Sequence, residues 1–349
     1  MSLYDRLFGD LTTRGVAALT VFVLLLLALP AFASSYIATV VTIVLYLAFL
    51  GQAWNLMLGI AGLLSIGHAL FVGIGAYASA YLFAVHGIPP LIGVLVSVAL
   101  AVAVGALIGY LGFRFAISGV YFALLTIAFA EFTRIVVDHA KFLGGTEGLF
   151  LPVSAASRRG IDLVNLRGWP EMFYYVILVL ALAAFALCRW LLTGRTGYYW
   201  RAIRDNPEAA RALGVNIFRY RMYAAMISAG MAAVGGVFYA FFYNNLFPEQ
   251  VFGIERSIEL TLAPIVGGVG TLFGPIFGAF ILTPLGELFT AGVEWLQTSG
   301  LIGAHVKVDG VKPLFWGIAV AAIVLLRPRG LWPWVCDRLG LVKPPAERS

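Results

Sequence analysis

NPEAARALG, at residues 206–214, reads as a short helix with a start and a stop signal, set in an arginine-rich loop between two apolar stretches. Asn206 is a good N-cap residue, Pro207 suits the first helical position, and Gly214 suits the left-handed position that ends a helix. Glu208 complements the positive end of the helix dipole. About two turns of helix are too short to be stable alone in water. We therefore expect this helix to dock against a partner.

The composition of the chain is that of a membrane protein. Of 349 residues, 61% are hydrophobic and 11% are charged, and the mean hydropathy is +0.95. These values indicate a polytopic membrane protein and exclude a soluble enzyme. The net charge of +6 comes with arginines beside apolar stretches, which reflects membrane topology, so no nucleic-acid partner is implied. Cys188 and Cys336 show neither metal-ligand spacing nor a disulfide framework, and we expect free thiols.

Ten apolar windows approach the length that a bilayer requires, roughly 17 to 24 residues. They lie near 16–34, 36–58, 66–85, 91–112, 119–138, 172–192, 221–242, 257–272, 274–292 and 313–326. We therefore predict an all-α integral membrane protein with ten crossings, forming one polytopic domain over residues 1–349. Residues 1–33 also resemble a signal peptide, with Ala31-Phe32-Ala33 before Ser34, but the many later spans favour an uncleaved first span.

Arginines predict which side of the membrane each loop occupies. The positive-inside rule places the loop 193–220 in the cytoplasm, because Arg201, Arg204, Arg211 and Arg219 lie within it and Arg221 follows it directly. With ten crossings both termini are then cytoplasmic, and the inner segments hold 15 of the 23 Lys and Arg residues. The one long outer loop is 139–171, and long translocated loops obey the charge rule less strictly.

Glycine clusters at 59–75 and at 267–278. Small residues let membrane helices pack closely, and this explanation covers most of these glycines. The alternative is that two helices are interrupted where a pathway must open, with irregular backbone lining a cavity. Pro264 and Pro275 beside the second cluster are compatible with an interrupted helix. The sequence leaves both explanations open.

Motifs for covalent chemistry are absent from the sequence. An ATPase needs a phosphate-binding loop of the form G-x-x-x-x-G-K-[ST], and none of the four lysines follows a glycine. The H-E-x-x-H and G-x-S-x-G patterns are also missing, so nothing favours a membrane protease or hydrolase. If ATP drives this protein, the ATPase is another polypeptide, and the short helix is the place where its force enters.

Ionisable residues within spans are costly and are therefore candidates for function. Glu131, Arg134 and Asp138 share one helical face, which favours a partly neutralised charge cluster near the outer end of a span. Glu259 and Glu287 are expected to have no basic partner nearby in sequence. Each of them suits a pathway, a helix cap or the headgroup boundary, and Glu259 in particular is a candidate for the pathway or a permease interface.

Uncharged polar residues within spans form a second group of candidates: Gln52, Asn55, Ser65, His68 and Thr126. They are able to hydrogen-bond a polar solute in a pathway. Bundle interiors use the same residue types to bond one helix to another. His68 in particular is more typical of a packing residue than of a ligand.

The order and spacing of several motifs resemble LivM-type permeases of the branched-chain amino acid ABC importers, over nearly the whole chain. The motifs are GLLSIGHA at 62–69, GIGAY at 73–77, GVYFA at 119–123, GGTEGL at 144–149, RAIRD at 201–205, EAA at 208–210, PIVGGVGT at 264–271 and RPRGL at 327–331. Together they are a specific signal, whereas EAA followed by glycine alone is weak.

This resemblance implies a permease of the type II ABC importer kind in a bacterial inner membrane. It implies a second, LivH-like permease, two ATPase subunits like LivG and LivF that bind ATP and Mg²⁺, and a periplasmic or lipid-anchored solute-binding protein. No cofactor is expected on this chain. Helix 207–213 becomes the coupling helix, and the candidate coupling residues are Arg201, Arg204, Asn206, Pro207, Glu208, Ala209, Ala210, Arg211 and Gly214.

The resemblance indicates the type of transporter better than the transported solute, because importers of urea, short-chain amides and aromatic acids share these motifs. A proton- or sodium-driven secondary transporter with Glu131, Glu259 or Glu287 as carriers is the main alternative. A membrane scaffold that transports nothing is a third possibility. In the outer loop, Arg158 and Arg159 are expected to receive a binding protein with acidic lobes, unless they are incidental residues of a solvated loop.

Overall fold

Long apolar helices make up most of the chain, because within a bilayer every backbone polar group must be bonded inside the protein. The computed structural model describes residues 11–153, 160–299 and 311–342. Its longer helices are α2 (Thr13–Phe32), α3 (Ser35–Asn55), α4 (His68–His86), α5 (Pro90–Arg114), α6 (Val120–His139), α7 (Pro170–Thr193), α10 (Ile217–Tyr243), α12 (Ile254–Gly267), α13 (Gly274–Thr298) and α14 (Val311–Leu326).

Shorter elements connect these helices. They are the π-helix η1 (Leu56–Ile60), the 3₁₀ turns η2 (Lys141–Leu143) and η3 (Gly145–Glu147), and the helices α8 (Arg195–Asp205), α9 (Pro207–Ala212), α11 (Pro248–Phe252) and α15 (Leu331–Leu339). Strand β1 (Leu149–Phe150) pairs antiparallel with β4 (Asn245–Leu246), and β2 (Ile161–Asp162) with β3 (Arg167–Gly168). These two-residue strands lie at the ends of spans, so the predicted all-α fold class is confirmed.

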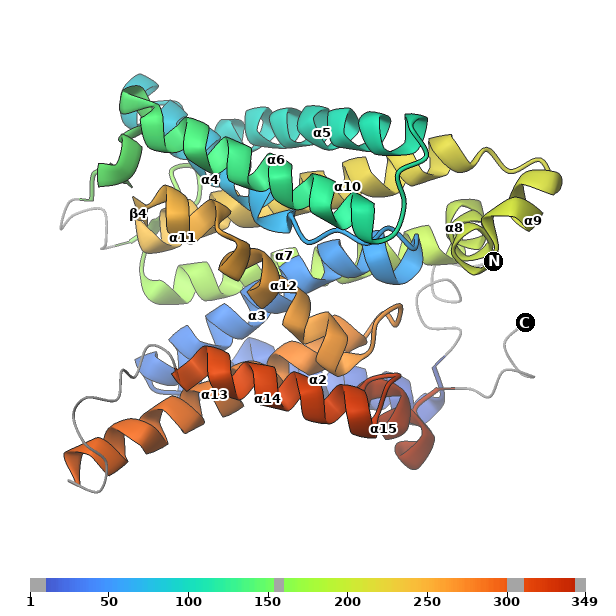
Figure 1. Cartoon of the computed structure of the whole chain (residues 1–349). Coiled ribbons are helices and arrows are strands. Elements are labelled where there is room, and N and C mark those ends of the chain that lie inside the picture. The colour runs from blue at the N-terminus through green and yellow to red at the C-terminus, as the bar shows by residue number, and fades with distance from the viewer. Residues whose placement is uncertain (1–10, 154–159, 300–310, 343–349) are drawn as a thin grey trace.

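The helices pack in a bundle whose centre is α3, α4 and α10 (Figure 1). Helices α4, α5 and α10 pack together, while α3 packs against α7, α12 and α13, and α14 covers α13. Small residues permit the tightest contacts: a Cβ on Gly236 of α10 would lie 2.0 Å from the carbonyl oxygen of Val72 on α4. Close backbone approach between small residues is the usual way in which membrane helices associate.

The predicted span 257–272 is wrong in its extent. Helix α12 stops at Gly267, and the chain is not helical again until Gly274. Fourteen residues of helix reach about 21 Å, short of the roughly 30 Å of a bilayer core. Within the described residues, eight helices are long and apolar enough to span, or nine if the bent pair Pro313–Leu326 and Leu331–Leu339 counts as one. Of the ten longer helices, α12 and α14 are by themselves too short to count as full crossings, with 14 and 16 residues.

The predicted loop 193–220 is also more structured than expected. Helix α8 occupies Arg195–Asp205, and α10 begins at Ile217, inside the predicted loop. Near the ends of the described chain, the hydroxyl Oγ1 of Thr12 donates to the carbonyl oxygen of Gly340 at 2.8 Å. The start of α2 and the helix α15 thus lie together, at the same end of the bundle as α8 and α9 (Figure 1).

Candidate functional site

Helix α9 has the cap and the stop that its sequence predicts. The side-chain oxygen Oδ1 of Asn206 accepts a hydrogen bond from the backbone N–H of Ala209 at 3.0 Å, and Pro207 is the first helical residue. Gly214 adopts φ +84°, a left-handed conformation in which glycine costs least. The buried Ala210 packs with Ile203 and Ile217, so one face of α9 is fixed to the protein.

The other face of α9 is open to a partner. Leu213, directly after the helix, has 84% of its surface exposed although it is a large apolar residue. A protein partner that covered Leu213 would remove this apolar surface from water, which is favourable. The sequence did not predict a docking role for Leu213, because a single leucine between a helix and its terminal glycine is not a recognisable motif. Its exposure in the folded structure is what makes it a candidate.

Helix α8 fixes α9 to the membrane bundle. Trp200 is fully buried, and its indole Nε1 donates to the carbonyl oxygen of Tyr220 on α10 at 2.7 Å. Ile203, one turn later, joins the apolar cluster beneath α9. Because α8, α9 and α10 share these contacts, they form one packed unit rather than a loose loop.

Arg204 links this unit to the first glycine cluster. Its guanidinium nitrogen Nη1 donates to the carbonyl oxygen of Gly59 at 2.6 Å. Gly59 lies in the π-helix η1, where α3 ends. The chain then leaves helical geometry, with Gly62 at φ +72°, and α4 begins at His68. The first glycine cluster thus contains a non-helical break, which lies between η1 and α4.

The second glycine cluster contains the other interruption, and it touches the first. Segment 268–273 separates α12 from α13, with Gly268 at φ +129° and Gly270 at φ +80°. Asn55 bonds this segment twice: its Oδ1 accepts from the N–H of Gly270 at 2.7 Å, and its Nδ2 donates to the carbonyl of Thr271 at 2.9 Å. Gln52 Nε2 donates to the carbonyl of Leu272 at 2.6 Å.

Known proteins similar to this chain are transport permeases. The profile of the family described as "Branched-chain amino acid transport system / permease component" matches residues 36–326. The chain belongs to this permease family. It is thus a transport component, in a family whose ATPase activity resides on separate subunits.

Individual relatives agree with this assignment. The high-affinity branched-chain amino acid permease LivM of Escherichia coli K12 is 27% identical over 350 residues, covering 95% of this chain and 78% of LivM. The probable LivM of Methanocaldococcus jannaschii is 21% identical over 86% of this chain and 88% of its own length. The autoinducer 2 import permease LsrC of Yersinia pestis is 32% identical over 40% of this chain and 38% of LsrC. No solved structure matches the chain.

The buried polar candidates of this permease are bonded within the protein. Ser65, His68 and Thr126 are each at most 1% exposed. The hydroxyl of Ser228 donates to the carbonyl of Ala53 at 2.7 Å, so its oxygen must accept from Nε2–H of His68 at 2.8 Å. Nδ1 of His68 then accepts from Ser65 Oγ at 3.2 Å. A neutral His68 with its proton on Nε2 satisfies all three groups.

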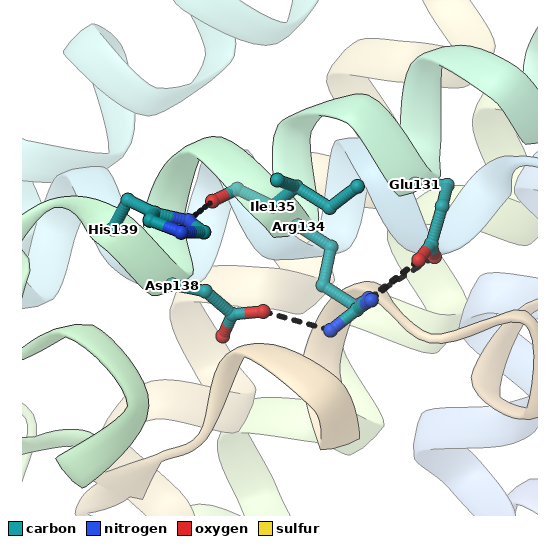
Figure 2. Close-up of polar contacts among 5 residues, drawn as sticks. All are labelled: Glu131, Arg134, Ile135, Asp138 and His139. Atoms are coloured by element: carbon teal, nitrogen blue, oxygen red, sulfur yellow. Dashed lines mark hydrogen bonds and ion pairs between the residues drawn. The ribbon is translucent and has the colours of Figure 1, made fainter.

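Glu131, Arg134 and Asp138 of α6 form the predicted charge cluster (Figure 2). Arg134 Nε donates to both carboxylate oxygens of Glu131 at 3.0 Å, and Nη1 donates to Asp138 at 2.7 Å. The Glu131 side chain is 47% exposed on the bundle surface. Two carboxylates and one guanidinium leave this face of α6 with a net negative charge.

Glu259 has a basic partner, contrary to expectation. Arg256, one turn earlier on α12, bonds Glu259 Oε2 through Nη1 at 2.6 Å, and both side chains are less than a quarter exposed. The guanidinium also donates to the hydroxyl of Tyr239 at 3.1 Å. The i, i+3 spacing of Arg256 and Glu259 is the sequence feature that predicts this ion pair. The apolar residues around Glu259 make the segment resemble an uninterrupted span, which hides that feature.

Arg158 and Arg159 lie outside the described residues. Within the described part of the outer loop, Arg167 is buried, and its guanidinium carbon lies 5.1 Å from the ring centre of Phe83 and 5.4 Å from that of Phe241. It donates to Asn244 Oδ1 and to the carbonyl of Pro152. Burial lowers the pKa of Arg167, and these contacts fix the loop to the ends of α4 and α10.

Proposed function

We propose that this chain is one of two permease subunits in an ATP-driven importer, with α9 seated in a cleft of an ATPase subunit. The proposal rests on one observation: α9 is exposed on one side and anchored on the other. Leu213, directly after α9, faces outward, while Ala210 of α9 and Trp200 of α8 pack these two helices against α10. A movement imposed on α9 must therefore move α8 and α10 as well. ATP and Mg²⁺ belong to the ATPases in this proposal.

The proposed cargo is a branched-chain amino acid. Two of the relatives above are named for branched-chain amino acid transport and match this chain over most of its length, whereas the autoinducer 2 permease matches over less than half. A zwitterion needs polar contacts at both charged ends and apolar lining for its side chain, and an external solute-binding protein would supply much of this selectivity.

The second permease would cover the face formed by α6, α11 and α12. This face carries the Glu131–Arg134–Asp138 cluster and the Arg256–Glu259 pair on neighbouring helices. A charged side chain facing lipid costs about 2.5 to 3.5 kcal/mol near the bilayer centre. A protein partner enclosing a water-filled pathway avoids that cost. Glu131 and Glu259 are therefore candidates for the pathway or the permease interface.

In this arrangement the end of the bundle that holds α8 and α9 faces the cytoplasm of a bacterial cell. The positive-inside rule supports this orientation, because Arg201, Arg204 and Arg211 lie there. Both ends of the described chain meet at this same end of the bundle, which supports the proposal that both lie on the cytoplasmic side. The outer loop then faces the solute-binding protein.

Arg158 and Arg159 are proposed to attract acidic lobes of that binding protein. Reversing both charges should weaken docking of the binding protein to the assembled complex, and the loss should be largest at low ionic strength, where screening is least. The measurement is a binding titration at about 0.01 M and about 0.15 M salt. Equal affinity of both forms at low salt would remove this docking site from the proposal.

Uptake in proteoliposomes tests the proposed function. The chain, the second permease, both ATPases and the binding protein are reconstituted together, and radiolabelled leucine uptake is measured with enclosed ATP and with ionophores that abolish proton and sodium gradients. Uptake that requires ATP and survives the ionophores is expected. Uptake driven by an ion gradient without ATP would favour the secondary transporter, and a complex that transports no solute would favour the scaffold.

A further inference from the structure

Arg204 occupies the place where three segments distant in sequence meet. It is the penultimate residue of α8, two residues before the N-cap of α9. Its Nη1 is bonded to the carbonyl of Gly59. A Cβ on Gly270 would lie 2.9 Å from the same nitrogen and 2.7 Å from the Gly59 oxygen. The guanidinium therefore contacts the glycine break after α3 and the one between α12 and α13 at once.

The backbone segments next to Arg204 are closely packed, while its side chain is 38% exposed and also pairs with Asp205 at 3.4 Å. A Cβ on Gly62 would lie 3.0 Å from Cγ of Arg204, and a Cβ on Gly59 would lie 2.4 Å from the backbone nitrogen of Gly270. Asn55, one turn before Gly59, holds the 270–271 backbone by two hydrogen bonds. The two breaks touch through backbone atoms, with no flexible side chain between Gly59 and Gly270. A shift of Arg204 must therefore displace both breaks together.

The neighbouring arginine of α8 lacks this arrangement. Arg201 donates to the carbonyls of Leu192 and Gly197, at the end of α7 and the start of α8. Its hydrogen bonds in the described structure thus stay within the segment that carries it. Arg204 reaches a carbonyl 145 residues away in sequence. Of these two arginines, Arg204 is therefore the one whose side chain reaches from α8 to the glycine breaks of the membrane bundle.

We propose that Arg204 is a positioning residue that transmits movement of α9 to the two glycine breaks, and so couples ATP hydrolysis to opening of the pathway. This inference rests on the proposed function of α9. Non-helical backbone at Gly62, Gly268 and Gly270 interrupts the rigid helices there, so a displacement of these breaks would change the directions of the helix ends. Arginine suits the role because its guanidinium has several donors in a fixed plane and stays charged.

The test compares Arg204→Gln with Arg195→Gln in the reconstituted complex. Arg195 is exposed at the first position of the same helix, so its substitution controls for the loss of one positive charge. Assembly, ATP hydrolysis and leucine uptake are measured on each. For Arg204→Gln we expect assembly and hydrolysis near wild type and uptake per ATP lowered at least about fivefold, the lower end of typical coupling between sites. Arg204→Lys, which keeps the charge and one donor, should restore part of the ratio.

A second pair of variants keeps the proposal testable if Arg204→Gln does not assemble. Gly270→Ala places a methyl group against both Arg204 and Gly59, whereas a Cβ at Gly292 would meet nothing within 4 Å. Gly270→Ala should lower uptake per ATP, and Gly292→Ala should not. A wild-type ratio in Arg204→Gln or Gly270→Ala, or an equal loss in Arg195→Gln, would overturn the role of Arg204. Absence of ATP-driven uptake by the wild-type complex would instead count against the proposed function.

Discussion

At the scale of single residues, the hydrogen bonds of His68 assign it to the core. Replacing His68 by leucine leaves Ser65 and Ser228 without their ring partner. Hydrogen bonds between membrane helices contribute about 0.6 kcal/mol on average and up to about 1.7. We expect His68→Leu to lower the unfolding midpoint of the purified chain while uptake per folded complex stays near wild type. His139→Leu, at an exposed position, is the control. Lost uptake with an unchanged midpoint would place His68 in the pathway instead.

A second prediction about single residues concerns the Arg256–Glu259 ion pair. Glu259→Gln leaves the guanidinium, bonded to Glu259 at 2.6 Å, without its carboxylate, and an unpaired group of this kind costs about 1 to 3 kcal/mol or more. Removing both charges is less costly than removing one. If the pair supports the permease interface, assembly should fall in Glu259→Gln and recover in the double variant Arg256→Gln/Glu259→Gln. Assembly that is intact in both, with uptake lost in both, would show a role in the pathway.

At the scale of elements, the proposed coupling role of α9 depends on where this helix stops. Gly214 has open space around it, so a side chain there is opposed by its φ of +84° alone. A left-handed conformation costs an ordinary residue roughly 1 to 2 kcal/mol, and asparagine tolerates it best. Gly214→Val should therefore reduce copurification of the ATPase and ATP-driven uptake, whereas Gly214→Asn should retain both. Glu208→Lys, which places a positive charge at the helix start, should act like Gly214→Val. Equal uptake in the valine and asparagine variants would show that the stop is not required.

Some elements could be predicted from the sequence and others could not, depending on whether the signal lies within a few residues. Caps act within a few residues, so the start and end of α9 could be predicted from NPEAARALG. Helix α8 was missed because its arginines resemble a loop, although Gly197, Trp200 and Ile203 recur at helical spacing on its buried face. The predicted span at 257–272 extended too far because Leu272 and Phe273 continue the apolar pattern past the break. Only the folded backbone shows that Gly268 and Gly270 leave helical geometry there.

At the scale of the whole molecule, composition and apolar periodicity predicted the class of protein, and the sites depend on contacts that no local pattern contains. Asn55 meets Gly270 across 215 residues, and Arg204 meets Gly59 across 145. Both glycine clusters could be identified in sequence as possible interruptions. Their contact with each other and with α8 follows only from the packing of α3, α12 and α13, which places the two breaks side by side.

A photo-cross-link from position 213 is the most direct test of the claim that α9 receives the ATPase. A photoreactive residue replaces the 84%-exposed Leu213 in the assembled complex in its native membrane. The control position is the exposed Phe142 in η2, which follows α6, and α6 ends at the opposite end of the bundle from α9 (Figure 1). We expect an adduct between position 213 and an ATPase subunit and none from position 142. A complex that imports its solute while position 213 labels only lipid, or any protein other than an ATPase, would contradict the docking of α9 on the ATPase.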